Sequence, residues 1–437
     1  MNARNRRAAI AVGATVLATS LAACGGGGGA ADGGTVEIEF LTQDGGTSVP
    51  LAEAMIEAFQ TANPDVVVKL QTQPGGTEGD NLTKTKLSTQ EMSDVFTYNS
   101  GSLLQALNPD QTLVPLSDQP WVGDLSEDFA QVVSTPNGLY GAPVGTSRVG
   151  AVMYNRALYE ELGLEVPTSW SEFMANNETI AAEAPDVAPI IQTYGDTWTS
   201  QLFVLGDFAN VQSADPQWAA EYTAGNRSYA EEPGLAGFRH QQEAFEADLF
   251  NEDFPSATFE NGLRMLAEGE GAHYPMLTDS ISTIQQNNPD AVDDIGVFAL
   301  PADDAANTAI TVWQPNAIYI PSTTEDEKLE AAKRFVTFFN SPEGCAVQSE
   351  VLVPGGPFVT SACPAPEDAP PIIADIQEYF DSGATTPALE FLSPIKGPNL
   401  ENITVAVGSG ITSAADGAAQ YDEDVRKQAQ QLGLEGW

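Results

Sequence analysis

Strand patterns and helical patterns alternate along the sequence from Val36 onward, and this alternation constrains the fold more than any other feature. Val36–Phe40 alternates apolar and polar residues, and the apolar residues between Leu51 and Phe59 then recur at helical spacing until Asn63-Pro64. Val66–Leu70 and Asp94–Tyr98 repeat the strand pattern. This order predicts an α/β fold with mostly parallel sheets, helices on both faces, and ligands bound beyond the carboxyl ends of the strands.

Two later helix starts carry a capping-box pattern, in which a Ser or Thr is followed three residues later by a Glu. The first pair is Ser169 with Glu172, and the second is Thr324 with Glu327. The second pair predicts a helix that ends before Ser341-Pro342 and turns four residues toward a core: Ala331, Phe335, Phe338 and Phe339.

The first residues have the pattern of an export signal. Three arginines at positions 4, 6 and 7 precede the apolar run Ala8–Leu21, which is short for a membrane-spanning helix. The run leads into Leu21-Ala22-Ala23-Cys24, which resembles the lipobox of bacterial lipoproteins. That resemblance implies a signal peptide over residues 1–23 and acyl chains on Cys24, which would become the mature N-terminus. An ordinary secretory signal with an incidental cysteine is the alternative.

The glycine-rich residues 24–34 then predict a flexible tether. Two further cysteines, Cys345 and Cys363, stand eighteen residues apart, and export would permit a disulfide between them. Two unpaired buried thiols are the alternative. Neither cysteine has a His or a second Cys at metal-ligand spacing, so no metal or catalytic role is expected for them.

The composition excludes several classes of function. The 437 residues include 17 Lys and Arg against 61 Asp and Glu, a net charge of −44, which argues against nucleic acid as a partner. His240 and His273 are the only histidines, and they stand 33 residues apart, which excludes an HExxH motif and a multi-histidine metal site. Removal of residues 1–23 takes away three arginines and leaves 14 basic against 61 acidic residues, or −47. This charge favours a neutral ligand over an anion, although acidity also serves solubility.

An ordered series of short motifs resembles a known family. The central motifs are followed by supporting pieces in the same order: Gly138–Pro143, Met153–Arg156, Glu161–Leu164, Pro167–Trp170, Phe173, Phe259–Gly262, Gly269–Ala272, Ile295–Pro301, Ala331–Gly344 and Asn399–Gln431. Together they are similar to the bacterial extracellular solute-binding proteins of family 1, which serve ABC importers of maltose and other oligosaccharides. The resemblance covers nearly the whole mature chain.

The resemblance implies a periplasmic-binding-protein-like fold, with two α/β lobes joined by a hinge of three chain crossings and a ligand cleft between them. The implied N-lobe covers residues 35–145 and 302–340, and the implied C-lobe covers residues 146–301 and 341–437. The crossings would lie near Pro143–Arg148, Leu300–Asp303 and Asn340–Glu343. Closure of the hinge would trap the ligand.

The implied protein is a monomeric, lipid-anchored receptor on the extracytoplasmic face of the cell membrane. It would bind a neutral carbohydrate, an oligosaccharide in particular, and deliver it to the transmembrane subunits of an ABC permease. No enzymatic activity, cofactor or metal is expected, and a separate ATPase would hydrolyse ATP. Two alternatives stay open: a secreted lipoprotein glycosidase with paired carboxylates, and a receptor for a cationic solute held by Asp44, Asp196 and Asp279.

Sugars stack their C–H faces on aromatic rings and need hydrogen-bond partners for their hydroxyls, so rings and polar side chains after strand ends are the candidates. In the N-lobe, Asp44 matches a position where relatives place a polar ligand contact, and Tyr98 one where they often carry a stacking ring, with Asn99 beside it. A turn aspartate before Gly45-Gly46 and a tyrosine at the edge of the core are the alternatives.

In the C-lobe, Tyr194, Asp196 and Trp198 resemble the stretch that lines the cleft, and Trp313-Gln314 matches a cleft loop that is commonly glycine-rich. Trp198 could instead belong to the core.

Three further positions bear on the cleft. Arg148 could bridge sugar hydroxyls or only pair with a carboxylate. Asp279 stands where relatives usually have a stacking tryptophan, which favours a ligand recognised by hydrogen bonds. Lys396 and Asn399 lie in a segment that could close the cleft or form a surface loop.

Overall fold

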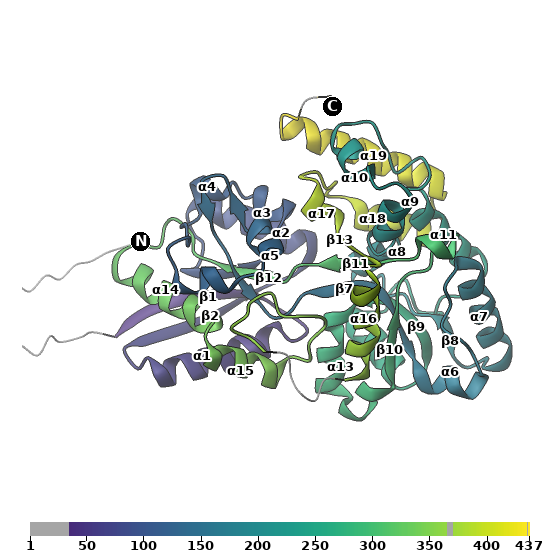
Figure 1. Cartoon of the computed structure of the whole chain (residues 1–437), viewed down its shortest axis with the longest axis horizontal. Coiled ribbons are helices and arrows are strands. Elements are labelled where there is room, and N and C mark those ends of the chain that lie inside the picture. The colour runs from purple at the N-terminus through teal and green to yellow at the C-terminus, as the bar shows by residue number, and fades with distance from the viewer. Residues whose placement is uncertain (1–34, 365–369, 435) are drawn as a thin grey trace, which may run out of the picture. The chain divides into compact units, whose positions relative to one another are not determined.

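In a computed structural model of the chain, the first two strands lie side by side in the first of two large sheets. β1 (Val36–Gln43) pairs in parallel with β2 (Val66–Gln73) over their whole length (Figure 1). The strand order is β2-β1-β3-β12-β6, with β3 at Val95–Tyr98, β6 at Ala142–Val144 and β12 at Asn316–Tyr319. The structure describes residues 35–364, 370–434 and 436–437. The predicted signal peptide, Cys24 and the predicted tether lie outside the described residues.

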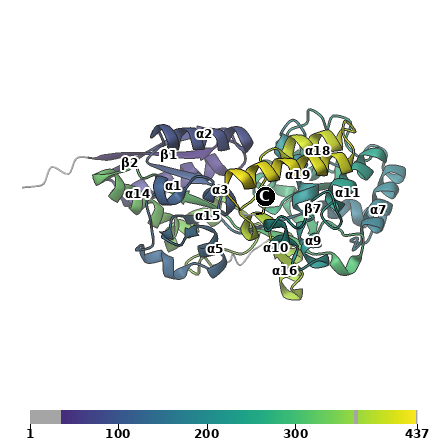
Figure 2. The same cartoon turned by 90° about the horizontal axis from the view of Figure 1, so that it is seen from above.

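Helices cover both faces of the first sheet. Figure 2 shows α2 (Gly76–Thr89) on the opposite side of β1 from α1 (Ser48–Ala62) and α14 (Asp326–Phe339). The ring of Phe335, from α14, lies 5.2 Å from that of Phe40 and 5.0 Å from that of Phe59, both in edge-to-face geometry. These contacts fix α14 against the sheet although almost three hundred residues separate it from β1 in the sequence. The short helices near this sheet are α3 (Ser102–Gln105), α4 (Pro109–Thr112) and α5 (Glu127–Val132).

The second sheet has the order β13-β11-β7-β9-β8, with β10 paired to β7. Its strands are β7 (Arg148–Asn155), β8 (Ala188–Ile190), β9 (Gly271–Leu277), β10 (Ile295–Phe298), β11 (Ile310–Trp313) and β13 (Thr385–Pro387). Both sheets are mixed, so the prediction of mostly parallel sheets is wrong. Every antiparallel pair in these two sheets includes β7 or β12, the strands that the chain enters on passing from one sheet to the other. A separate hairpin pairs β4 (Ser134–Thr135) with β5 (Gly138–Leu139).

The remaining helices follow or pack around the second sheet. They are α6 (Arg156–Leu162), α7 (Trp170–Glu183), α8 (Leu202–Leu205), α9 (Phe208–Ala214), α10 (Trp218–Thr223), α11 (Ala236–Glu246), α12 (Phe259–Ala267), α13 (Ile281–Asn287), α16 (Pro371–Ser382), α17 (Leu389–Leu392), α18 (Leu400–Gly408) and α19 (Ala414–Gln431). Within the ranges that the structure describes, no helix is long and apolar enough to cross a bilayer.

The two predicted capping boxes have different outcomes. At α7 the box is confirmed: the Ser169 hydroxyl accepts from the Glu172 N–H, and the Glu172 carboxylate accepts from the Ser169 N–H. At α14 the prediction is wrong, because the helix begins at Asp326 and Glu325 is its N-cap. The Thr324 hydroxyl donates instead to the carbonyl of Asp94, at 3.1 Å, and so anchors the helix start to the strand β3 region.

Among the described residues, three chain segments run between the two sheets or contact both. Gly145–Ser147 links β6 to β7, and Gln314-Pro315 links β11 to β12. The third path leaves α15 (Pro342–Val351), which packs against α1, and reaches Val353 in the core of the second sheet. We call these three the crossing segments, the third comprising Leu352–Phe358. Two of the passages therefore lie further along the chain than Leu300–Asp303 and Asn340–Glu343: β11 pairs within the second sheet, and α15 packs beside the first.

The sulfur atoms of Cys345 and Cys363 are bonded, which closes a loop around the third crossing segment. Cys345 lies in α15, and Cys363 follows residues that bond to the first-sheet side, where the Ser126 N–H donates to the Val359 carbonyl at 2.8 Å. Both cysteines therefore lie on the side of the first sheet, while the middle of the loop contacts the second sheet.

We expect the double variant C345S/C363S to lose about 3 kcal/mol of unfolding free energy, because a disulfide over this separation of eighteen residues restricts the unfolded chain. Urea unfolding of the variant and of the wild-type protein, with and without reductant, measures the loss. Two titratable thiols at Cys345 and Cys363 in the native protein without reductant would contradict the pairing.

Candidate functional site

A cavity of about 110 Å³ lies where the two sheets approach each other. Its first-sheet wall includes Thr42, near the end of β1, and Thr97, near the end of β3, whose hydroxyl oxygens are 3.0 Å apart. β1 and β3 are parallel, so their carboxyl ends meet at one edge and bring these two hydroxyls together. Thr47 and Ser48, at the start of α1, add two more hydroxyls to the same wall.

Charged and amide groups form the wall nearest the crossing segments. The Arg148 guanidinium donates from Nη2 to the Asn316 Oδ1 at 3.1 Å, and its Nε lies 3.6 Å from the Asp279 carboxylate. Arg148 is the first residue of β7 and Asn316 the first of β12, so this contact joins the second sheet to the first. The Arg148 side chain is 13% exposed and that of Asp279 is 47% exposed. The Asp279 carboxylate is therefore accessible to a solute, and Ser282 lines the cavity beside it.

Of the ligand residues expected from the sequence, Arg148 and Asp279 line the cavity together. Gln314 lies in a crossing segment two residues before Asn316 and is nearly buried. Asp44 is exposed directly after β1, and its N–H donates to the Gln73 carbonyl at 2.8 Å. The Asn99 carbonyl accepts from the Tyr319 hydroxyl at 3.0 Å, which binds this residue to the first sheet. The role of these residues as ligand contacts stays a prediction.

The expected stacking rings in this region are packed against protein. Tyr98 is 1% exposed at the end of β3, and Trp313 is 6% exposed. The Trp313 ring lies over Gly150, where a Cβ would be only 2.5 Å from a ring carbon. Neither residue offers an open ring face to a solute in this arrangement.

A charged cluster lies next to Tyr98. Burial raises the pKa of Asp80, on α2, against the opposing influence of the nearby Tyr98 hydroxyl and Lys396. Lys396 pairs with Glu390 at 3.2 Å, and the Glu390 side chain is mostly buried. Glu390 belongs to α17, and a role of Lys396 in closing a cleft stays a prediction. Asn399 instead donates its N–H to Asp424, which holds it on the second-sheet side.

The three residues expected near Tyr194 have structural partners. The buried Tyr194 hydroxyl accepts from Gln241 at 2.9 Å, and burial raises the pKa of this hydroxyl. The Asp196 carboxylate accepts from the Phe259 N–H at 2.7 Å and so caps the start of α12. Trp198 packs on Phe259, with the ring centroids 5.3 Å apart. None of the three lines the cavity.

The sequence analysis missed Thr42, Thr97, Asn316 and Ser282. The candidates were aromatic, charged and amide residues at strand ends, whereas these four residues supply mainly small hydroxyls to a lining that also contains apolar side chains. The available signal was positional: Thr97 directly precedes Tyr98, and Thr42 lies two residues before Asp44.

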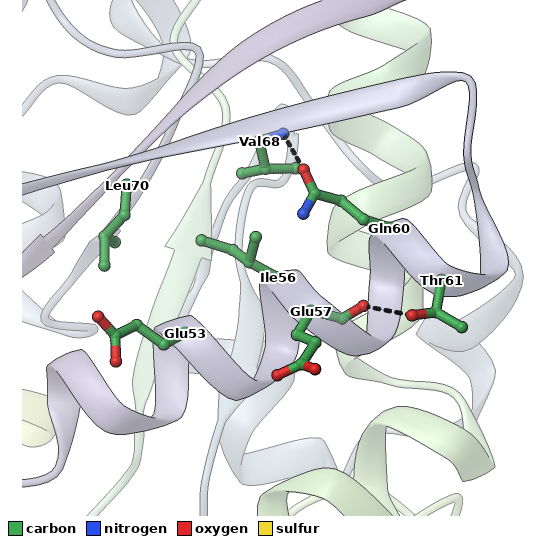
Figure 3. A pocket seen from close by; sticks show the side chains of 7 residues that line it. All are labelled: Glu53, Ile56, Glu57, Gln60, Thr61, Val68 and Leu70. Carbon is green, nitrogen blue, oxygen red and sulfur yellow. Dashed lines mark hydrogen bonds between the residues drawn. The ribbon is translucent and has the colours of Figure 1, made fainter.

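A larger hollow lies on the surface of the first sheet's helix α1, and Figure 3 shows it. Its volume is about 470 Å³, and its lining comes from α1 and β2: Glu53, Ile56, Glu57, Gln60, Thr61, Val68 and Leu70. The Gln60 amide oxygen accepts from the Val68 N–H at 2.9 Å, so this side chain satisfies an outward group of the edge strand β2. The Thr61 hydroxyl donates to the Glu57 carbonyl at 2.9 Å, so Gln60 and Thr61 both bond to backbone groups of the protein.

Both histidines have structural surroundings. His273 is buried, with its Nε2 2.6 Å from the Tyr159 hydroxyl, and burial lowers its pKa to about 3. His240 stacks on Trp170 with centroids 4.0 Å apart, and burial lowers its pKa as well. Among the residues that the structure describes, no three His, Cys, Asp or Glu side chains converge as a metal site.

Comparisons with known proteins agree with this architecture. Residues 45–344 match the family model described as bacterial extracellular solute-binding protein, and the chain belongs to this family. The multiple sugar-binding protein of Streptococcus mutans is 22% identical over 346 residues, which cover 77% of this chain and 78% of that protein.

Solved structures share the periplasmic-binding-protein fold. A chitin oligosaccharide binding protein matches with a TM-score of 0.77 and 18% identity, over 91% of this chain and 99% of that one. The solute-binding protein RafE in complex with raffinose matches with a TM-score of 0.76 and 19% identity, over 90% and 100%. A Bacillus licheniformis sugar transporter protein in complex with stachyose gives 0.72 and 16%, over 90% and 100%.

We expect Arg148 and Asp279 to contribute little to stability as a pair. A double-mutant cycle with R148M and D279N should give a coupling of at most about 1 kcal/mol, because the Asp279 carboxylate is about half exposed to water. Thermal or urea unfolding measures it, with the surface pair Arg264 and Glu268 as the matched control. A coupling well above that of the control would mean that the pair is a structural bridge and is not available to a solute.

Proposed function

We propose that this solute-binding protein is the sugar receptor of an ABC importer, held by a lipid on the extracytoplasmic face of the bacterial membrane. It would bind a neutral carbohydrate, an oligosaccharide in particular, and deliver it to the transmembrane subunits of the permease. The single observation that carries the proposal is the polar lining of the cavity: hydroxyls, one amide and the Arg148–Asp279 pair converge there from both sheets. Sugar hydroxyls need such a mixture of donors and acceptors.

The size of the cavity supports a hinged mechanism. A volume of about 110 Å³ is smaller than the several hundred Å³ (roughly 300–1,000 Å³) of ordinary ligand sites, so an oligosaccharide requires its walls to separate. Within the described residues, the crossing segments run between the two sheets or contact both, and such a movement would be absorbed in them. The bound solute would then stabilise the state in which both walls contact it, and the permease would recognise that state.

The lobes that follow from this mechanism differ slightly from the sequence expectation. An N-lobe of residues 35–145 and 302–340 and a C-lobe of residues 146–301 and 341–437 remain the basis of the proposal. Sheet membership supports moving Ile310–Trp313 to the C-lobe and α15 to the N-lobe. We further propose that each molecule works as a monomer, since one chain supplies both walls.

A neutral solute suits the electrostatics better than the cationic alternative. The cationic reading needs Asp44, Asp196 and Asp279 to converge, but Asp196 caps α12 and only Asp279 lines the cavity. Arg148 stands next to Asp279 and offsets its charge. The strongly acidic chain also disfavours an anionic solute.

The lipid anchor rests on the sequence. Residues 1–23 would be the signal peptide, Cys24 the acylated first residue, and residues 24–34 the tether that holds the receptor off the membrane. The paired Cys345 and Cys363 are compatible with an exported protein. We propose no enzymatic activity, and this sets the receptor apart from a secreted glycosidase.

Calorimetric titration of the mature protein against raffinose, stachyose and a chitin tetrasaccharide tests the proposal. We expect saturable binding of at least one sugar without turnover, since the cavity offers hydroxyl partners, and no heat from spermidine. Binding of spermidine and of none of the sugars would replace the substrate class. Release of smaller sugars during the titration would identify an enzyme.

Asn in place of Asp279 should weaken sugar binding at least tenfold, about 1.4 kcal/mol, because the amide loses one strong acceptor for the sugar hydroxyls. Asp196→Asn is the matched control, and it should alter thermal stability through the α12 cap while leaving affinity unchanged. Affinities that fall for the control and not for Asp279→Asn would move the ligand site toward Tyr194–Trp198.

A further inference from the structure

One buried hydroxyl joins the cleft residues to the crossing segments. Thr278 is fully buried and opens the short 3₁₀ helix η3 (Thr278–Ser280), directly after β9. Its hydroxyl accepts from the Val149 N–H at 2.9 Å and donates to the Gly355 carbonyl at 2.6 Å. The hydroxyl therefore acts as both donor and acceptor, and it joins the backbone of β7 to that of the third crossing segment.

The two backbone groups lie next to the charged pair of the cavity. Val149 follows Arg148 in β7, and Asp279 follows Thr278 in η3 (β7 and β9 are labelled in Figure 1). A single side chain thus fixes the backbone one residue away from both members of the pair. The third segment, around Gly355, is the crossing segment that leaves α15.

The contact with Gly355 is too close for any other residue. A Cβ at this position would lie 2.7 Å from the Asp279 nitrogen and 2.8 Å from its Cα, both backbone atoms that cannot move aside. The Gly355 N–H donates to the Thr146 hydroxyl at 3.1 Å, in the first crossing segment. The Gly355 backbone therefore packs directly against the Asp279 backbone, and this close approach requires a glycine.

Neighbouring bonds extend this contact along the third crossing segment. The Ser282 hydroxyl donates to the Val353 carbonyl at 2.8 Å, and the Ser147 N–H and hydroxyl both donate to the Pro357 carbonyl, each at 2.9 Å. A shift of this segment would therefore move the Thr278–Ser282 stretch with it. Asp279 lies inside that stretch.

We propose that Thr278 is a positioning residue: its hydroxyl, shared between Val149 and Gly355, holds the Asp279 carboxylate beside Arg148 and couples that carboxylate to the third crossing segment. The proposal rests on the proposed function, because it assigns a role in the affinity for the same solute. A shift of the third crossing segment against the second sheet would strain the bond between Thr278 and Gly355 and would loosen the Asp279 carboxylate beside Arg148.

The test compares three variants of the mature protein. Thr278→Val keeps the shape and removes the hydroxyl, and Thr278→Ser keeps the hydroxyl. Thr404→Val is the matched control, since Thr404 is also fully buried and its hydroxyl bonds to the Leu400 carbonyl and to Ser200, away from the cavity. Titration with the same three oligosaccharides should show at least a tenfold loss of affinity for Thr278→Val and less than twofold for the other two.

A second measurement needs no ligand and no substitution that could prevent folding. Hydrogen exchange of the wild-type protein should show a protected Val149 amide, and Thr278→Ser should retain that protection. Rapid exchange of Val149 in the wild-type protein would overturn the proposal. Equal affinity losses in Thr278→Val and Thr404→Val would also overturn it, because the effect would then follow stability alone. Failure of all three sugars to bind wild-type protein would reject the proposed substrate class, and Val149 exchange would still test whether the Thr278 hydroxyl holds this amide.

Discussion

The hydrogen bonds among the crossing segments are the constraint on which the rest of this structure depends. The two sheets share no strand, so their relation is set where Gly145–Ser147, Gln314-Pro315 and Leu352–Phe358 run between them. Side-chain hydroxyls of Thr146 and Ser147 bond to backbone groups of the third segment. Backbone groups that would otherwise be buried without partners are satisfied there, and these bonds hold the first and third segments together.

This arrangement explains why the cavity lies where it does. The carboxyl ends of β1 and β3 supply Thr42 and Thr97, while Arg148 and Asn316 begin the two strands that leave the crossing segments. The ends of these strands and of the crossing segments therefore meet at the cavity, and each contributes a polar side chain to its lining. The same backbone that connects the sheets therefore builds the site between them.

The sequence predicted the helices and strands better than the direction in which the strands pair. Period-two and helical patterns located β1, α1 and β2, and the motifs that resemble the solute-binding family indicated the fold. The direction of strand pairing was wrong because it depends on where the crossings fall, which no local pattern encodes. Thr324 was assigned to a cap because its spacing fits, but its hydroxyl bonds to Asp94, far away in sequence. Thr42, Thr97 and Thr278 were missed since threonine is an ordinary strand residue.

The charge of the chain and the lining of the cavity fit one kind of selectivity. Most Lys and Arg side chains of the described residues pair with carboxylates, as Arg156 does with Asp375 and Arg334 with Asp65. The large acidic excess therefore remains as a negative field around the molecule. An uncharged solute is neither attracted nor repelled by that field, so its selection must come from short-range hydrogen bonds inside the cavity. Those bonds are directional, and under the proposed function they would discriminate only if Asp279 and Arg148 are held in place by the backbone behind them.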